Sequence, residues 1–292
     1  MDRVLITGGT GSLGRKLVKH YFKRGWKVRV LSRCEDKQSR LKIKYPGVEF
    51  VLGDVRDMET CYDACKGVDL VIHTAALKRI EFGEEFPKEF IDTNLKGTKN
   101  MVECASARMS DLVFISTDKA CKPINVYGMT KALAEKIVTN AGFNCVRYGN
   151  VNNSRGSVIP YWLELRKKGE PLPVTNTDMT RFMISFDEAI KLIETASETM
   201  EGAIYVPKLK SVRLMSIVDA LGCDFEVVGE RPGEKLHEVL INEDEFRGRV
   251  IDRGKYYTVV KQRDMRRAKK FEYSSETAER INTKELNKIL CL

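Results

Sequence analysis

The sequence contains no long hydrophobic run. None of its apolar stretches approaches the roughly 18 residues that a membrane-spanning helix requires. The N-terminus leads from Met1 almost directly into the short apolar run VLITGG, which lacks the pattern of a secretory signal. We therefore expect a cytoplasmic protein without a membrane anchor.

Histidine is scarce and cysteine is scattered. His20, His73 and His237 have no partners at metal-ligand spacing, and the eight cysteines form no zinc-type pair. A cytoplasmic chain of 292 residues has no need of disulfides, so we interpret the cysteines as buried or incidental thiols. The sequence predicts no metal site.

Acidic residues are outnumbered by basic ones, 41 to 50, which gives a formal net charge of +9. Such an excess fits nucleic acid, an anionic surface or a small anionic substrate. The basic residues are spread along the chain, and the densest run, KQRDMRRAKKFEYSS, is typical of a solvated face. We therefore expect no nucleic-acid partner. With 42% hydrophobic and 31% charged residues, the composition is that of a soluble globular protein.

Short apolar runs alternate with longer amphipathic ones through the first half of the chain. The expected strands are 3–8, 27–32, 48–54, 68–76, 111–117 and 143–150, and the expected helices are 13–25, 57–67, 87–108 and 125–142. This alternation predicts parallel strands joined by right-handed crossovers. The fold class is therefore α/β, with a doubly wound parallel Rossmann-type sheet that binds ligands at the carboxyl ends of its strands.

The alternation weakens after residue 150. Segments such as RGSVIPYWLELRKKGEPLPV and VGERPGEKLHEVLI are expected to form short helices and loops. We expect residues 1–150 to form the nucleotide-binding domain. Residues 151–292 are expected to form mainly a smaller, mixed substrate-binding domain with interleaved segments, packed over the ligand edge of the sheet.

The first turn reads TGGTGSLG and places Gly8, Gly11 and Gly14 at three-residue intervals between a strand and a helix. Glycine permits the tight turn and the close approach of a pyrophosphate, and the amides at the helix start can bind its charge. A simple packing turn is the alternative, but the flanking strand and helix favour a dinucleotide site.

The second strand ends in VLSRCEDK, where an NAD-binding protein usually carries an acidic residue for the ribose. Ser32, Arg33 and Lys37 suit a 2′-phosphate instead, so the sequence favours NADP, against a weaker opposing signal from Glu35 and Asp36. The full set of candidate cofactor residues is Gly8, Thr10, Gly11, Ser12, Leu13, Gly14, Ser32, Arg33, Lys37, Asp54, Val55, Ala75, Ala76, Lys78, Asn94, Tyr127 and Lys131.

Tyr127 and Lys131 form a Tyr-x-x-x-Lys pair in the stretch FISTDKACKPINVYGMTK. Residues four apart share one face of a helix, so we expect the ammonium to lie near the phenol and to lower its pKa. Tyr127 could then take a proton from a substrate hydroxyl while hydride moves to the cofactor. With Thr117 supplying a further hydroxyl after the fifth strand, the pair indicates a short-chain dehydrogenase/reductase centre.

Asp118 and Lys119 follow Thr117 directly and are expected to point into the same pocket. A carboxylic acid can protonate a leaving hydroxyl, and a base can remove the proton beside a ketone, so this pair adds the means to eliminate water. Burial is expected to raise the pKa of Asp118 and, together with Lys131, to lower the pKa of Lys119. The alternative is an ion pair on a solvated turn.

Several stretches of the chain are similar to those of the extended short-chain dehydrogenase/reductases. The chain resembles in particular the inverting UDP-N-acetylglucosamine 4,6-dehydratases of the pseudaminic acid type. The matching stretches are LITGGTGSLG, GDVRD, AALK, STDKACKPINVYGMTK, RYGNV, SRGSVIP, MTRFMIS and RPGEKLHE.

The resemblance implies a role for each residue of the reactive centre. Tyr127, assisted by Lys131, deprotonates the sugar 4-hydroxyl as hydride moves from C4 to tightly bound NADP. Lys119 removes the C5 proton and Asp118 protonates the departing 6-hydroxyl, after which hydride returns to C6. Reprotonation from the opposite face inverts C5. Retaining relatives carry Glu at the position of Lys119.

The resemblance also implies a set of UDP-sugar contacts: Lys78, Asn150, Arg155, Val158, Thr180, Arg181, Arg231 and Glu234. Arginine binds a diphosphate bidentately, which favours its use here. The chain departs from the family pattern at Asn152-Asn153, where relatives usually carry an apolar residue and glycine, so the substrate loop can differ.

The expected function is a UDP-GlcNAc 4,6-dehydratase with bound NADP, acting as a homo-oligomer. A UDP-sugar 4-epimerase or ketoreductase of the same fold is the nearest alternative, in which Asp118 and Lys119 would have no task. A non-catalytic nucleotide-binding protein is the third interpretation of the sequence. The intact set of Thr117, Tyr127 and Lys131 argues against this interpretation.

Overall fold

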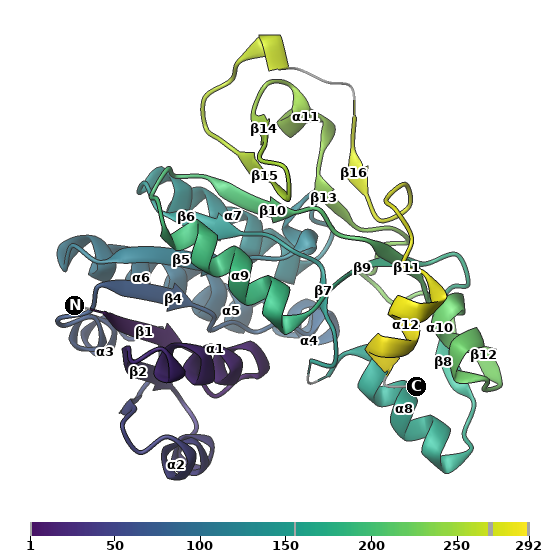
Figure 1. The fold of residues 1–292 in the computed structure, drawn as a ribbon, viewed down its shortest axis with the longest axis horizontal. Coiled ribbons are helices and arrows are strands. Elements are labelled where there is room, and N and C mark those ends of the chain that lie inside the picture. Colours follow the sequence, from purple (N-terminus) through teal and green to yellow (C-terminus); the bar gives the residue numbers. More distant parts are fainter. Residues whose placement is uncertain (1, 155, 268–270, 291–292) are drawn as a thin grey trace.

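A nine-stranded sheet forms the centre of the molecule (Figure 1). The structure is a computed structural model and describes residues 2–154, 156–267 and 271–290. In spatial order the strands are β3 (Glu49–Leu52), β2 (Lys27–Ser32), β1 (Arg3–Thr7), β4 (Leu70–His73), β5 (Asp111–Ile115), β6 (Asn144–Val146), β10 (Ile204–Pro207), β15 (Tyr256–Val259) and β14 (Val250–Asp252). The first seven are parallel, β15 pairs antiparallel with β10, and β14 pairs antiparallel with β15. The predicted doubly wound sheet is confirmed, with two antiparallel strands added at one edge.

Helices cover both faces of this sheet. On one face α1 (Ser12–Lys23) contacts α9 (Phe186–Ser197). On the other, α6 (Gly97–Ala107) packs against both α3 (Met58–Ala64) and α7 (Val126–Asn140). Because helices shield both faces, the inner residues of β1 and β4 are apolar without alternation and have no exposed surface.

The sequence does not predict α2 (Glu35–Lys44), which packs beside β3. Only Gln38 and Leu41 of this helix are buried. Its remaining residues are polar or exposed, so the apolar period is too weak to mark a helix.

The expected helix over 87–108 is instead composed of three segments. These are α5 (Pro87–Phe90), a π-helical turn over Ile91–Lys96, and α6. A short helix, α4 (Ile80–Glu85), precedes them. The π turn buries the Asn94 side chain, and such turns occur frequently at functional sites.

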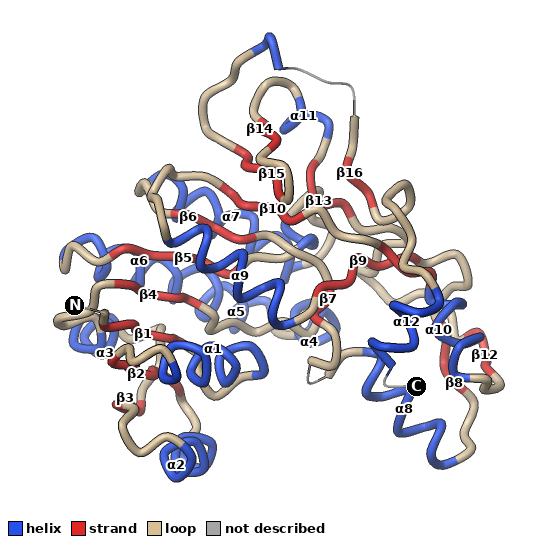
Figure 2. Tube along the Cα trace, in the orientation of Figure 1, coloured by secondary structure: helices blue, strands red, loops and turns tan. Residues whose placement is uncertain are grey.

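The C-terminal part contains three small sheets (Figure 2). Their strands are β11 (Ser211–Arg213), β9 (Thr180–Ile184) and β7 (Asn150–Val151); β12 (Phe225–Val227) and β8 (Leu172–Val174); and β13 (Val239–Ile241) and β16 (Tyr273–Ser274). The helices of this part are α8 (Val158–Lys168), α10 (Leu214–Leu221), α11 (Glu243–Phe246) and α12 (Thr283–Leu290), with a 3-10 turn over Met265–Arg267. Another 3-10 turn, Asp118–Ala120, follows β5 in the first part of the chain.

The chain passes between the two parts more than once. Trp162, Leu172 and Ile217 belong to a second hydrophobic core around α8, α10 and α12. In contrast, β10, β14, β15 and α9 come from the second half of the sequence but complete the large sheet. Residues after 150 therefore contribute to both parts.

The carboxyl ends of β1, β4 and β5 meet at one edge of the sheet, because these strands are parallel neighbours. The glycine turn, residues 74–78 and residues 116–119 follow these three strands and are thereby brought together. Within the described ranges, none of the helices is both long and apolar enough to cross a membrane.

Candidate active site

A tight turn with three glycines follows β1. Gly8 adopts a φ of +65°, and the amide of Gly11 donates a hydrogen bond to its carbonyl at 2.8 Å. A Cβ atom on Gly14 would lie 2.4 Å from that carbonyl oxygen, so only glycine allows α1 to pack this closely on the turn. Gly11 has no side chain to cap α1, so the amides of the first turn are left for a phosphate group.

A cavity of about 620 Å³ lies between α1, α2 and the segment around residues 153–160. Its polar and charged lining residues are Thr10, Ser12, Arg15, Lys16, Lys19, Asp36, Lys37, Arg40, Lys44 and Asn153. Thr10, Ser12 and Lys37 of the predicted cofactor set are thus brought together here. Cations greatly outnumber the single carboxylate, so the cavity favours an anionic group.

The end of β2 carries the other residues expected to recognise a 2′-phosphate. Ser32 is buried and its hydroxyl accepts a hydrogen bond from Gln38 Nε2 at 3.0 Å. Arg33 is half exposed, with Nη1 at 3.5 Å from Asp54 Oδ2. Burial acts to raise the pKa of Asp54, but Arg56 and Arg33 outweigh it and hold that pKa below its usual value. A phosphate at this site would compete with Asp54 for Arg33.

The loop after β4 is held by hydrogen bonds to the sheet and to the π turn. The Ala75 amide donates to Thr7 Oγ1 at 3.2 Å. Asn94 accepts from the Leu77 amide at 2.8 Å and donates to the Leu77 carbonyl at 2.9 Å, so its side chain fixes the loop that carries the exposed Lys78. The remaining apolar residues of the predicted cofactor set are buried or half-buried: Leu13, Val55 and Ala76.

Tyr127 lies in the first turn of α7, close to the end of β5. Asn125 caps this helix by accepting a hydrogen bond from the Gly128 amide at 2.7 Å. The phenol is hydrogen-bonded to Thr117. Burial raises the pKa of Tyr127 to about 12, against the lowering effects of Lys119 and Thr117. The expectation of a lowered pKa is therefore wrong, because burial outweighs the nearby cation.

Lys131 lies one turn further along α7 and is buried. Its Nζ donates to the Ile115 carbonyl at 2.5 Å and lies 3.8 Å from the centroid of the Phe114 ring. Burial lowers the pKa of Lys131 to about 7. Among the causes that act on the Tyr127 pKa, the lowering by a cation comes from Lys119.

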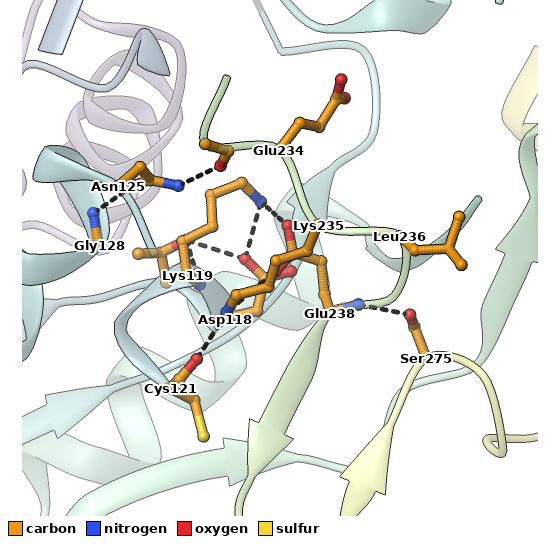
Figure 3. Close-up of polar contacts among 12 residues, drawn as sticks. Asp118, Lys119, Cys121, Asn125, Gly128, Glu234, Lys235, Leu236, Glu238 and Ser275 are labelled. Carbon is orange, nitrogen blue, oxygen red and sulfur yellow. Dashed lines mark hydrogen bonds and ion pairs between the residues drawn. The ribbon is translucent and has the colours of Figure 1, made fainter. Parts of the chain in front are cut away.

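Asp118 and Lys119 meet Glu238, which comes from the C-terminal part of the chain (Figure 3). Lys119 Nζ lies 3.1 Å from Asp118 Oδ1 and 2.9 Å from Glu238 Oε1. The exposed fractions are 1% for the Asp118 side chain, 15% for Lys119 and 2% for Glu238. The alternative of a solvated ion pair on a surface turn is therefore excluded. We call these three residues the acid–base cluster.

The acid–base cluster has unused acceptor atoms. Thr117 Oγ1 donates to Asp118 Oδ1 at 3.0 Å. Asp118 Oδ2 and Glu238 Oε2 are buried, and within the part of the chain that the structure describes they have no hydrogen-bond partner. Buried polar atoms are rarely left unpaired in proteins, so these oxygens mark a place where a polar ligand fits.

The protonation of the cluster agrees with the sequence-based expectation at one residue and contradicts it at another. Burial raises the pKa of Asp118, as expected. Burial also acts to lower the pKa of Lys119, but the carboxylates of Asp118 and Glu238 outweigh it and hold that pKa above its usual value. The expected lowering at Lys119 is therefore wrong, because Asp118 and Glu238 together outweigh the effect of burial.

The segment that carries Glu238 is fastened to the loop after β5 that carries Asp118, Lys119 and Cys121, which we call the catalytic loop. Lys235 Nζ donates to the Cys121 carbonyl at 2.7 Å, and Asn125 Nδ2 donates to the Gly233 carbonyl at 2.7 Å (Figure 3). Asn125 also caps α7, so one side chain joins this segment to the helix that carries Tyr127. The site is thus assembled from both parts of the chain.

Two of the predicted diphosphate arginines are paired with carboxylates. Arg181 is buried, with Nη2 at 3.1 Å from Glu234 Oε1. Arg231 is exposed and its Nη1 lies 2.7 Å from Glu81 Oε1. Arg181 also faces the acid–base cluster, since it influences the pKa values of Lys119 and Glu238. An anionic substrate would exchange these carboxylates for its own oxygens.

Other predicted substrate residues have structural contacts. Thr180 Oγ1 is bonded to His237 Nδ1 at 2.9 Å and to Ser275 Oγ at 2.7 Å, so this hydroxyl holds the small sheets together. Asn150 begins β7 and Val158 begins α8. Arg155 lies outside the described residues.

Sequence reasoning missed Glu238 and Lys235, although both lie in the matching stretch RPGEKLHE. A signal was present for Glu238: it directly precedes the fully apolar strand β13, where a charged side chain is forced inward. Nothing in the sequence indicates that its partner is Lys119.

Comparison with known proteins identifies the family. The family model described as "Polysaccharide biosynthesis protein" matches residues 4–261. The UDP-N-acetylglucosamine 4,6-dehydratase (inverting) of Campylobacter jejuni serotype O:2 is 38% identical over 261 residues, covering 83% of this chain and 78% of that protein. The UDP-glucose 4-epimerase of Rickettsia bellii RML369-C is 36% identical over 323 residues, covering 98% of this chain and 94% of that protein.

Solved structures have the same fold. The X-ray structure of Pen from Bacillus thuringiensis has a TM-score of 0.92 and 31% identity, and the match covers 99% of this chain and 98% of that chain. The UDP-glucose 4-epimerase of Thermus thermophilus, solved with NAD, has a TM-score of 0.70 and 25% identity. The match covers 80% of this chain and 88% of that chain. This chain therefore belongs to the polysaccharide biosynthesis protein family, within the extended short-chain dehydrogenase/reductases.

Proposed function

We propose that this protein is a UDP-GlcNAc 4,6-dehydratase that inverts C5 and uses bound NADP. Its relatives include nucleotide-sugar 4,6-dehydratases and 4-epimerases, which supports an enzyme of one of these two kinds. The observation that carries the choice is the acid–base cluster beside Tyr127. A 4-epimerase needs the tyrosine centre alone, whereas dehydration needs an acid and a base in addition.

The glycine turn and the basic cavity fit a dinucleotide. A Cβ atom would fill the turn at Gly14, and the cavity beside it offers Lys37 and Arg40 to a phosphate. This excess of cations supports NADP over NAD. When bound, such a cofactor would supply a reversible hydride acceptor next to the sugar.

Tyr127 takes the proton of the sugar 4-hydroxyl in the first half of the reaction. With a pKa raised to about 12 by burial, its phenol needs nearby positive charge to become a base. Lys119 supplies such a charge from within the acid–base cluster. Thr117, bonded to the phenol, orients it.

Asp118 and Lys119 perform the elimination. The raised pKa of Asp118 favours its protonated form, which can donate to the departing 6-hydroxyl. Lys119 can take the proton from C5, which the 4-ketone makes acidic, once its own proton has passed to Asp118, whose Oδ1 lies 3.1 Å from its Nζ. The C5–H and C6–O bonds break, a C5–C6 double bond forms, and water leaves with the Asp118 proton. The 4-hydroxyl proton taken by Tyr127 balances the proton that Asp118 gives up.

Arg181 and Arg231 support a diphosphate-linked substrate. Each is paired with one carboxylate, Glu234 or Glu81, which a diphosphate can replace with two charge-assisted hydrogen bonds. Arg181 also influences the pKa of Lys119 in the acid–base cluster, which supports a sugar position between the diphosphate site and Tyr127.

A UDP-sugar 4-epimerase is the second candidate. It is supported by the Rickettsia bellii UDP-glucose 4-epimerase, whose similarity extends over 98% of this chain. In that case Lys119 would serve only as the cation beside Tyr127.

The test is NMR of UDP-GlcNAc incubated with the purified protein in D2O without added cofactor. A 4-keto-6-deoxy product with deuterium at C5 and the L-arabino configuration is the expected result. Appearance of UDP-GalNAc instead would make the protein an epimerase. No reaction, even with added NADP, would contradict both candidates for this sugar.

A further inference from the structure

Glu238 lies directly against the residue that must act as the base. Its Oε1 is 2.9 Å from Lys119 Nζ, opposite Asp118 Oδ1 at 3.1 Å. Only 2% of the Glu238 side chain is exposed. A charge at this distance and depth changes the protonation of its neighbour far more than a charge on the surface does.

The position of Glu238 is fixed by its backbone. Its amide donates to Ser275 Oγ at 2.9 Å, and the Ser275 amide donates to its carbonyl at 2.8 Å. Lys235, three residues earlier, is bonded to the Cys121 carbonyl in the loop after Lys119. The backbone that carries Glu238 is therefore anchored on two sides, and the carboxylate reaches Lys119 from this fixed point.

The hydrogen bonding of Glu238 is incomplete. Its Oε2 is buried and, among the residues that the structure describes, accepts no hydrogen bond. The Lys235 ammonium is 3.7 Å from this oxygen, which is beyond hydrogen-bond distance. A carboxylate that served only to stabilise the fold would be expected to have both oxygens paired.

We propose that Glu238 is a positioning residue of the reaction, which holds the Lys119 amine facing Asp118 and sets the pH range in which Lys119 can act as a base. Because Lys119 acts as a base only in the proposed dehydration, this inference rests on the proposed function. The inference goes beyond the proposed function because it assigns a task to Glu238, a residue outside the centre of Thr117, Tyr127 and Lys131.

Several charged or titratable groups face Lys119, and Glu238 must be weighed against all of them. The groups that act on or near its ammonium are Asp118, Glu238, Arg181, Tyr127 and Lys78, and Lys235 faces Glu238 in turn. Of these, only Asp118 and Glu238 lie in ion-pair contact with Lys119. Removal of the Glu238 charge should therefore make the Lys119 proton markedly easier to lose.

The test is an NMR titration of protein labelled with 13C at lysine Cε. The Lys119 signal is identified by its absence in Lys119→Arg. In the wild type we expect it to stay in the protonated position from about pH 6 to about pH 10. In Glu238→Gln its midpoint should fall by about 1–3 pH units. An unchanged midpoint in Glu238→Gln would overturn the proposal.

A graded variant and a matched control keep the result interpretable. Glu238→Asp withdraws the carboxylate by one methylene and should lower the midpoint by less than Glu238→Gln does. This variant decides the question if the glutamine variant does not fold. Glu245→Gln removes another buried carboxylate of the C-terminal part, bonded to Arg147, and should leave the Lys119 signal unchanged.

The kinetic readout separates this inference from the proposed function. The pH dependence of dehydration in Glu238→Gln should move to lower pH by the same amount as the NMR midpoint. If the wild type forms no dehydrated product, the proposed function fails while the titration still reports on Glu238. If product forms but neither the midpoint nor the pH profile moves, the inference on Glu238 fails alone.

Discussion

Two buried clusters in this molecule have the same arrangement of charge, a cation between two carboxylates. In one, Arg147 lies between Glu135 and Glu245, and in the other Lys119 lies between Asp118 and Glu238. The first cluster ties α7, β6 and α11 together. The second joins the catalytic loop to the segment before β13.

The clusters differ in how fully their hydrogen bonds are made. Arg147 donates to both oxygens of Glu135, to both oxygens of Glu245 and to the Leu240 carbonyl. Lys119 pairs with one oxygen of each carboxylate, and within the described residues the other two oxygens are buried without a hydrogen-bond partner. A complete network stabilises a fold, whereas an incomplete one leaves binding capacity for a ligand.

Replacement of the catalytic cation should give the largest effect. Lys119→Met is expected to reduce dehydration by about 10²–10⁴-fold, because no amine remains to take the C5 proton. Oxidation at C4 should persist in part, so reduced nicotinamide accumulates and its absorbance can be followed. Lys122→Met, which removes an exposed lysine paired with Glu272, is the control and should dehydrate at the wild-type rate. Wild-type turnover in Lys119→Met would refute the role assigned to Lys119.

Replacement of the structural cation should affect stability instead. Arg147→Met leaves Glu135 and Glu245 buried without their cation, which is expected to cost about 3–5 kcal/mol of unfolding free energy. Urea denaturation measures this loss. The rate per folded molecule should stay close to wild type, and a selective loss of dehydration at full stability would contradict the distinction between the clusters.

A second buried lysine sharpens the comparison, because Lys131 contacts a carbonyl and a ring rather than carboxylates. Burial lowers its pKa to about 7, whereas an unfolded lysine keeps its proton to about pH 10.4. Between these values the unfolded chain binds more protons, so the contribution of Lys131 to stability rises with pH. Denaturation at several pH values should show this rise in the wild type relative to Lys131→Met. Parallel pH profiles would contradict it.

An exposed ion pair should give the smallest effect on stability. Arg231 and Glu81 are each about half exposed, and Glu81→Gln is expected to change the unfolding free energy by less than about 1 kcal/mol. The substitution frees Arg231, so calorimetry should show tighter binding of UDP, more clearly at low salt. Weaker UDP binding in this variant would argue against Arg231 as a diphosphate contact.

Much of the fold follows from local sequence patterns. The six strands from β1 to β6 are short apolar runs between amphipathic segments, and the glycine turn lies where its spacing indicates. The helix α2 could not be recognised, because it buries only two of its side chains. The π turn over Ile91–Lys96 has no local sequence signature.

The sequence predicted the residues of the candidate site better than it predicted their protonation states. Thr117, Asp118, Lys119 and Tyr127 do come together, because they are close in the sequence and lie at the end of one strand. The pKa of Lys119 could not be predicted, because it depends on Glu238, which lies more than a hundred residues away in the chain. The pKa of Tyr127 depends on burial that the whole fold creates.

The bond between Lys235 and the Cys121 carbonyl joins residues 114 positions apart in the chain. During synthesis on the ribosome, the catalytic loop therefore emerges long before the segment that completes it. A nascent chain can fold its glycine turn and early strands while Lys119 still lacks its second carboxylate. The acid–base cluster is therefore complete only after the C-terminal part of the chain has been synthesised.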